Sequence, residues 1–198
     1  MFELLAEHPA LDFVNTLDNR FSAAGPEELL PAYGDLLRLA AQLRLLSAEQ
    51  ARKLARDVTE REAQRVLASA VKLREALAAV LYARMDGNKP PAGQVAILER
   101  HFQQMAAHRV LRIAKSQLVW SWAGREQQAE IPLWKLAEAA SNLLVSTEAE
   151  RVKECGDPTC RWLFLDTSKN HTRRWCNMKT CGNRMKARKH QARMAGIP

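Results

Sequence analysis

Apolar residues follow a helical period over most of the first 150 positions. They recur every three or four residues between positions 33 and 46, from 66 to 81, and again from 133 to 146. This spacing places them on one face of an amphipathic helix, which buries that face against a core. We therefore expect residues 1–150 to form a mainly α domain, with a further helix over about 92–107.

Local start and stop signals agree with a helical domain. Ser47-Ala48-Glu49-Gln50 has the pattern of a capping box, in which the two outer side chains satisfy free backbone N–H groups at a helix start. Thr59 starts the longest helical stretch, which Asp86-Gly87-Asn88 ends ahead of Pro90-Pro91. Residues 110–122 differ, because they are rich in β-branched and aromatic side chains. That composition predicts a small β-hairpin.

All four cysteines lie in the last quarter of the chain, as two pairs with the same spacing. Four residues separate Cys155 from Cys160 and Cys176 from Cys181, and fifteen lie between the pairs. Zn²⁺ prefers four such ligands in a closed tetrahedron. Disulfides would require an oxidising compartment, and the N-terminal residues lack the features of a secretory signal. The pattern therefore predicts one structural Zn²⁺ bound by all four cysteines in a cytoplasmic protein.

The residues around the cysteines predict a treble-clef-like zinc finger over 151–198. Residues 161–166 and 172–176 have the composition of two strands around a turn, and 181–193 that of a helix whose first turn carries the last cysteine. The rings of Trp162 and Trp175 could stack on bases, but we expect them to form the small core of the finger. With so little apolar core, the finger would take much of its folding free energy from the metal.

Charge separates the chain at the same boundary. The net charge is +8; residues 151–198 hold 12 Lys and Arg against 3 acidic residues, whereas residues 1–150 hold 18 against 19. A basic segment of this kind indicates a polyanionic partner, most commonly nucleic acid. On the expected last helix, Lys186, Lys189 and Arg193 share one side. We expect this stripe to follow the phosphates of duplex DNA, the alternative being a solvated helix face. Further candidate contacts to DNA are Arg173, Arg174, Asn183, Arg184 and Arg188.

Two groups of polar residues have alternative roles. Asn183 and Arg184 are suited to a base edge or a phosphate, and equally to hydrogen bonds that tie the helix to the rest of the finger, for example through Asp166. Near the N-terminus an apolar run is interrupted by Asp12, Asn15 and Thr16. These three are candidates for an effector pocket, but we favour capping of a helix or pairing of buried backbone groups.

Several motifs resemble known families. The segment 152–193 resembles the CGNR zinc finger, named for the residues that stand here as Cys181-Gly182-Asn183-Arg184. The rest is similar to the ABATE-type domain that accompanies this finger in bacterial proteins described as putative stress-induced transcription regulators. The motifs that carry the two resemblances are Cys155, Cys160, Trp162, Phe164-Leu165-Asp166 and Arg174-Trp175-Cys176 in the finger, and Leu11-Asp12-Phe13-Val14-Asn15-Thr16-Leu17 and Ala137-Glu138-Ala139-Ala140-Ser141-Asn142-Leu143-Leu144 before it. The resemblance implies DNA binding and transcriptional control.

We therefore expect a DNA-binding regulator and not an enzyme. A zinc module that contacts RNA or protein is the alternative. A His-Asn-His nuclease is least favoured: His171, Asn183 and His190 supply the residue types, but no second cluster of acidic or histidine residues suggests a catalytic metal. No stretch approaches the ~20 apolar residues of a membrane span. The sequence leaves open whether the protein binds an unidentified small-molecule effector and whether it forms a homodimer.

Overall fold

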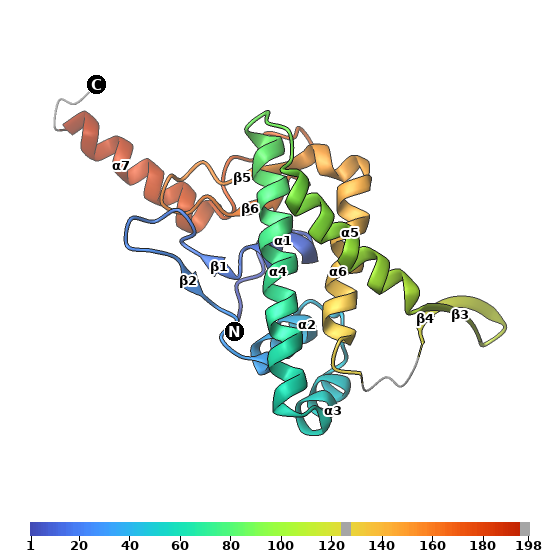
Figure 1. The fold of residues 1–198 in the computed structure, drawn as a ribbon. Helices are drawn as coiled ribbons and strands as arrows, with labels where there is room; N and C mark the ends of the chain where they lie inside the picture. The colour runs from blue at the N-terminus through green and yellow to red at the C-terminus, as the bar shows by residue number, and fades with distance from the viewer. Residues whose placement is uncertain (124–127, 195–198) are drawn as a thin grey trace.

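The computed structural model describes residues 1–123 and 128–194. The helices within these residues are α1 (Pro9–Val14), α2 (Tyr33–Gln42), α3 (Ala48–Asp57), α4 (Glu60–Met85), α5 (Ala92–Ala107), α6 (Ile131–Val145) and α7 (Asn183–Met194), with a 3₁₀ turn at Thr147–Arg151 and a π-helical turn at Met178–Gly182. The strands described form two-stranded antiparallel ladders: β1 (Leu17–Asp18) with β2 (Glu27–Glu28), β3 (Arg109–Ala114) with β4 (Gln117–Trp122), and β5 (Val152–Glu154) with β6 (Leu163–Leu165). Helices dominate, which confirms the predicted mainly α class (Figure 1).

Helices α3 and α4 begin where the sequence signals predict, whereas α2 ends at Gln42, before the end of the periodic stretch at position 46. The Ser47 hydroxyl accepts the N–H of Gln50 at 3.1 Å, and the Gln50 side chain accepts the N–H of Ser47 at 2.9 Å. Thr59 caps α4 in the same reciprocal way with Glu62. Both pairs are capping boxes, which satisfy N–H groups that have no partner inside the helix. The predicted hairpin is also confirmed, as β3 paired with β4.

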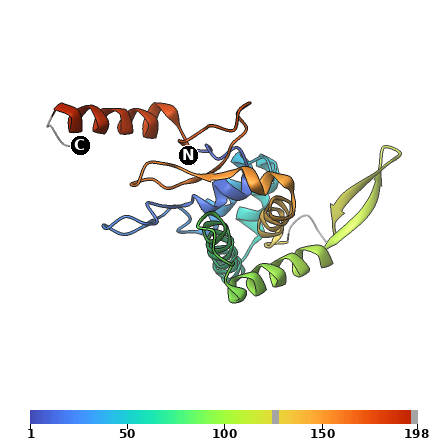
Figure 2. The same ribbon diagram turned by 90° about the horizontal axis from the view of Figure 1, so that it is seen from above.

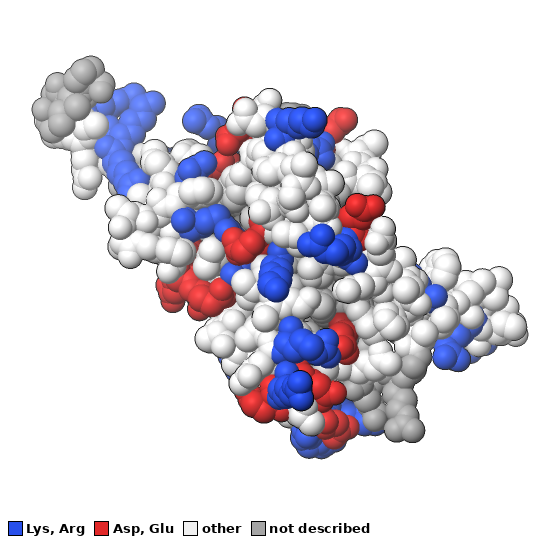
Figure 3. All heavy atoms as spheres, in the orientation of Figure 1, with Lys and Arg blue, Asp and Glu red and all other residues white. Residues whose placement is uncertain are grey.

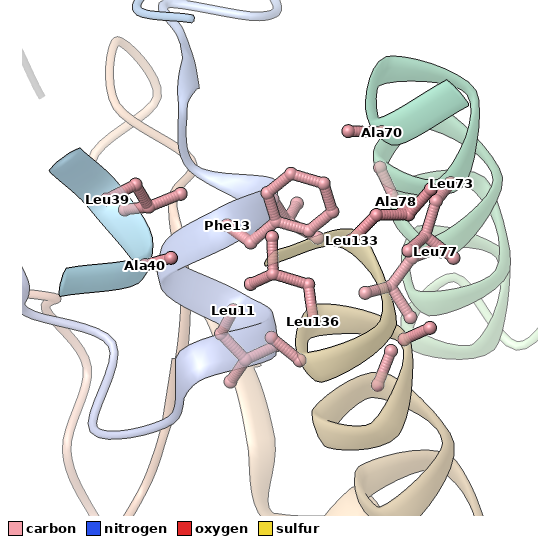
Figure 4. Close-up of a cluster of buried hydrophobic side chains, with 14 of the residues drawn as sticks. Leu11, Phe13, Leu39, Ala40, Ala70, Leu73, Leu77, Ala78, Leu133 and Leu136 are labelled. Carbon is pink, nitrogen blue, oxygen red and sulfur yellow. The ribbon is translucent and has the colours of Figure 1, made fainter. Parts of the chain in front are cut away.

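The short helix α1 lies at the centre of the hydrophobic core. Five of its six residues are buried, and Leu11 and Phe13 are completely inaccessible to solvent. Figure 4 shows these two side chains among the labelled leucines and alanines of α2, α4 and α6. A helix of this length has little stability of its own. Burial of a leucine or phenylalanine side chain contributes roughly 1.5–3 kcal/mol, so packing explains why α1 forms.

The core continues without a break into the cysteine-containing segment. All three residues of β6 are buried, and β6 packs against α1. The Asn15 side chain bonds both backbone groups of Leu163: its amide donates to the carbonyl oxygen at 2.9 Å, and its oxygen accepts the N–H at 3.0 Å. The N–H of Leu165 donates to the carbonyl of Ala6 at 2.8 Å. The helical domain therefore lines one edge of β6.

The pairing of β6 corrects the predicted finger. The composition predicts that residues 161–166 pair with 172–176, but β6 pairs with the preceding strand β5, and residues 172–176 form no strand. The reason is that Asn15 and Ala6 already occupy the free edge of β6. The later segment is held by other bonds instead, including one from the N–H of Gly156 to the carbonyl of Arg174 at 2.9 Å. The division into residues 1–150 and 151–198 stays a prediction.

Replacing Asn15 with leucine should destabilise the whole protein. The substitution leaves the N–H and carbonyl of Leu163 buried without these partners, at about 1–3 kcal/mol for each group. The measurement is the free energy of unfolding in urea, where we expect a loss of about 2–6 kcal/mol. The matched control is Asn170→Leu, an exposed site where changes are usually within about 0.5 kcal/mol. Equal stability of the two variants would contradict the role assigned to Asn15.

Candidate metal centre

The four cysteine sulfurs form one compact cluster. All four Sγ atoms lie within 4.8 Å of one another. Cys176 Sγ lies 3.6 Å from the Sγ of Cys160 and 3.6 Å from that of Cys181, and all four residues are free thiols. A tetrahedron with Zn–S bonds of about 2.3 Å has edges of about 3.8 Å. The cluster therefore fits one Zn²⁺ held by four thiolates, and the predicted structural zinc site is confirmed.

Short turns on both sides place the ligands. Cys155 follows β5 directly, and its N–H donates to the carbonyl of Trp162 at 2.8 Å across the ladder. Cys181 lies in the π-helical turn that runs directly into α7, and not in the first turn of the helix itself as the sequence predicts. Asn177 caps that turn, because its side chain accepts the N–H of Lys179 at 2.8 Å. Hydrogen bonds of the backbone and of Asn177 thus position both pairs of cysteines.

The packing of the thiols favours ionisation of at least one of them. Hydrogen bonds from Cys160 and Cys176 hold the pKa of the Cys155 thiol far below its ordinary value. Further thiolates at this spacing would repel one another in the absence of a cation. A divalent ion removes that repulsion, because metal binding displaces the remaining thiol protons.

Asp157 connects the metal centre to α7. Its carboxylate is completely buried and accepts the Thr159 N–H at 3.1 Å, Arg184 Nε at 2.6 Å and an Arg188 nitrogen at 3.2 Å. Arg184 also donates to Cys181 Sγ at 3.2 Å. Burial alone would raise the pKa of Asp157, but the hydrogen bonds from Thr159 and Arg184 outweigh it and lower the pKa. A single carboxylate therefore holds the first cysteine loop against the start of α7.

Asp157 is the functional residue that the sequence analysis missed, since Asp166 was the partner expected for Arg184. A local signal was present, because an Asp two residues before Thr159 is typical of a turn in which the carboxylate accepts that N–H. Asp166 has its own buried network, in which it accepts Lys153 Nζ at 2.6 Å and the N–H of Arg173 at 3.0 Å. Burial would raise the pKa of Asp166, but the bonds from Lys153 and neighbouring groups lower it well below its ordinary value.

Arg173 is bound inside the protein. Its guanidinium donates to the carbonyls of Trp175 and Leu5, each at 3.0 Å, and to that of Cys176. It also lies over the Phe164 ring, 4.5 Å from the centroid. These contacts fasten the N-terminal segment to the second cysteine loop.

The two tryptophans of the finger have different neighbours. Trp162 is half-buried, and its Nε1 donates to Asp18 at 2.7 Å, which links the finger to β1. Trp175 lies against Gly156, and also against Gly182, where an added Cβ would collide with Met178. A side chain at position 182 would therefore require the end of the Met178 side chain to move.

The basic helix α7 extends away from the rest of the protein (Figures 1 and 2). None of its residues is buried, and Met185 and Ala192 are half-buried while its other residues are exposed. Lys186, Lys189 and Arg193 are exposed, and no ion pair to another described residue holds any of them. Figure 3 shows the blue basic side chains along this helix.

Asp12, Asn15 and Thr16 are buried and bonded within the protein. Asp12 accepts the Ala6 N–H at 3.0 Å. The Thr16 hydroxyl donates to the Phe13 carbonyl at 2.7 Å and accepts a hydrogen bond from the buried Arg74 guanidinium at 3.1 Å. These bonds are of the structural kind that the sequence analysis favours. An effector pocket at these residues stays a prediction.

We expect Asp157→Asn to weaken Zn²⁺ binding by about 10-fold or more, because outer-shell partners orient the ligands of a metal. The loss of the carboxylate charge releases Arg184, which otherwise points at Cys181. The measurement is competition for Zn²⁺ with a chromophoric chelator, after metal analysis has established one zinc per chain. Asp57→Asn, at an exposed site, is the matched control. An unchanged zinc affinity in the Asp157 variant would remove this residue from the metal centre.

Asp12→Asn should stabilise the protein at neutral pH. Burial raises the pKa of Asp12 from 3.8 to about 6. The folded protein therefore binds this proton more tightly, and stability falls as the pH rises through that interval, by up to about 3 kcal/mol. Asparagine cannot ionise, so the free energy of unfolding in urea should rise for the variant relative to the wild type as the pH increases from 4 to 6. The comparison cancels the pH dependence of zinc binding common to both proteins. A difference that does not vary with pH would contradict the prediction.

Comparison with known proteins agrees with the two parts of the site. The model of the CGNR zinc finger matches residues 151–194. The model of the ABATE family, described as "Putative stress-induced transcription regulator", matches residues 7–147. No curated protein matches the chain. Since the second match alone covers well over half of the 198 residues, the chain belongs to the ABATE family of putative stress-induced transcription regulators and carries a CGNR zinc finger after that domain.

Proposed function

We propose that the protein is a zinc-dependent transcription regulator that binds duplex DNA through the exposed face of α7. The observation that carries the proposal is the basic stripe of Lys186, Lys189 and Arg193, three exposed cations without an acidic partner among the described residues. Uncompensated cations on one helix face attract phosphates and release the counterions of DNA.

The anchoring of α7 supports this orientation. At 100° per residue, Arg184 and Arg188 lie about 40° apart on the helix, and the centre of the basic stripe is about 150° away from them. Asp157 therefore holds one side of the helix, while the basic stripe points to solvent. An α-helix with side chains is about 10–12 Å wide, which suits the major groove of about 12 Å.

The other candidate DNA-contacting residues differ in whether their side chains are already bonded within the protein. Arg174 and Asn183 are exposed and stay candidates for DNA. Lys179, exposed in the π-helical turn beside the helix, joins them as an addition. Arg184 and Arg188 are 46% and 43% exposed at the side chain while bound to Asp157, so we assign them a secondary role at phosphates. We expect no DNA contact from Arg173, because its guanidinium is used inside the protein.

We place the protein in the cytoplasm, where a reducing environment keeps thiolates available for zinc. None of the helices in the described ranges is long and apolar enough to cross a membrane. The families matched are described as a regulator and a zinc finger, and we propose a binding function without catalysis. An unidentified effector of the helical domain is part of the regulator hypothesis.

Replacing Lys186, Lys189 and Arg193 together with alanine should weaken DNA binding and reduce its salt dependence. Three lost phosphate contacts lower the slope of log K against log salt by about 2–3. The measurement is a titration of duplex DNA with the zinc-loaded protein at several salt concentrations. The control is Arg52→Ala with Arg56→Ala and Arg61→Ala, which removes the same charge from exposed positions on α3 and α4.

Three outcomes would contradict this assignment. Equal affinity and equal salt slope for the α7 variant and the wild type would show that α7 is not the DNA surface. If the control variant weakens DNA binding as much as the α7 variant does, the effect depends on the net charge of the protein and not on α7. Tight binding to RNA or protein with only weak, salt-labile binding to duplex DNA would favour the alternative function.

A further inference from the structure

The β3–β4 hairpin forms an arm, residues 109–122, that projects from the helical body (Figures 1 and 2). Its base is firmly attached to α6. Arg109 forms an ion pair of 2.7 Å with Glu138, and the Trp122 ring stacks on Trp134 with centroids 5.8 Å apart. The His108 ring stacks on the same tryptophan at 4.0 Å. The arm therefore has a fixed origin, while its outer part has no cover from the described body of the protein.

The register of the arm collects its large apolar side chains on one face. Residues opposite one another in an antiparallel pair share a face, and successive residues alternate between faces. The pairs Leu111–Trp120 and Ile113–Leu118 therefore lie on the same face. Leu111, Ile113, Leu118 and Trp120 are 53%, 78%, 66% and 63% exposed. We call these four residues the apolar face of the arm; the other face carries Val110, Arg112, Ala114, Gln117, Val119 and Ser121.

This apolar face is unusual for an isolated hairpin in water. A two-stranded hairpin is at best marginally stable alone, and it gains stability when one face is buried. Clustered exposed apolar side chains mark interaction sites, unlike apolar residues scattered singly over a surface. The alternation also follows the pattern of a sheet built with one buried side.

We propose that the apolar face of the arm binds the same face of a second copy of this chain. The cation at its base, Arg109, is already paired with Glu138 and lies over the rings of Trp120 and Trp122. The face therefore presents apolar side chains without a free charge, and two identical faces match each other. Self-complementarity of this kind is what a two-fold symmetric interface requires.

The area available is sufficient for a specific contact. Four large side chains, each exposing more than half of its surface, offer roughly 400–500 Å² per copy. Two facing arms would bury roughly 800–1,000 Å² in total, the size of a weak, reversible protein interface. In both ribbon views the arm and α7 lie at opposite ends of the molecule. The dimer would therefore leave α7 uncovered, and its existence does not depend on DNA binding.

The test is sedimentation equilibrium of the full, zinc-loaded chain without DNA. The wild type should form a reversible dimer within the range of concentrations tested, which extends to about 100 μM. Leu118→Glu, on the apolar face, should raise the dissociation constant by at least about 100-fold, because the dimer would bury an unpaired carboxylate. Val119→Glu, the adjacent residue on the other face, should leave it within about twofold and serves as the matched control.

A second measurement covers the case in which a charged variant disturbs the arm. A photoreactive phenylalanine analogue placed at position 118 should crosslink two copies, and the same probe at 119 should not. The proposal is overturned if the wild type is monomeric over this range, which would leave the face to a different partner. It is also overturned if Leu118→Glu dimerises as the wild type does, or if the probe at 119 crosslinks as efficiently as the probe at 118.

Discussion

The backbone of a buried strand must find hydrogen bonds on both of its edges, and β6 meets this demand with two different parts of the chain. One edge is paired with β5, and the other with Asn15 and Ala6 of the helical domain. Since an unpaired buried backbone group is costly, removing either partner would destabilise the strand. The ladder that carries Cys155 therefore depends on α1. The metal centre and the helical core are in this sense one folding unit, although the two families matched divide near residue 150.

Charged hydrogen bonds connect the metal centre to the basic helix α7. The sulfur cluster concentrates negative charge, which Zn²⁺ compensates, and Arg184 donates to one of its sulfurs. Asp157 then fixes the orientation of Arg184 and Arg188. The direction in which α7 leaves the body is thus set by a buried carboxylate and a metal ligand, with no apolar core beneath the helix. Such a device suits a helix whose outer face must stay charged and solvated.

The features that could be predicted from the sequence are those whose signals are local. Capping boxes and helical periodicity act within a few residues, so the sequence alone is enough to place α3 and α4. The cysteine spacing is likewise sufficient for the zinc site. The partner of β6 is not predictable from composition, because two short neighbouring segments compete for it and the choice is made by Asn15, 148 residues away. The inward role of Arg173 also rests on a distant backbone carbonyl, that of Leu5, for which the sequence carries no periodic signal.

The attachment of α7 by its first turns alone has an entropic consequence. Its remaining turns must hold their shape by intrinsic preference, and the arginines, lysines, alanines and methionines that compose most of it are strong helix formers. A helix of 12 residues is still marginal when it is not packed against other elements. A polyanion that engages these turns would therefore also order them. The free energy needed to order the outer half of α7 would then reduce the free energy of binding, as in other segments that fold on binding. Binding affinity and helical content would therefore change together.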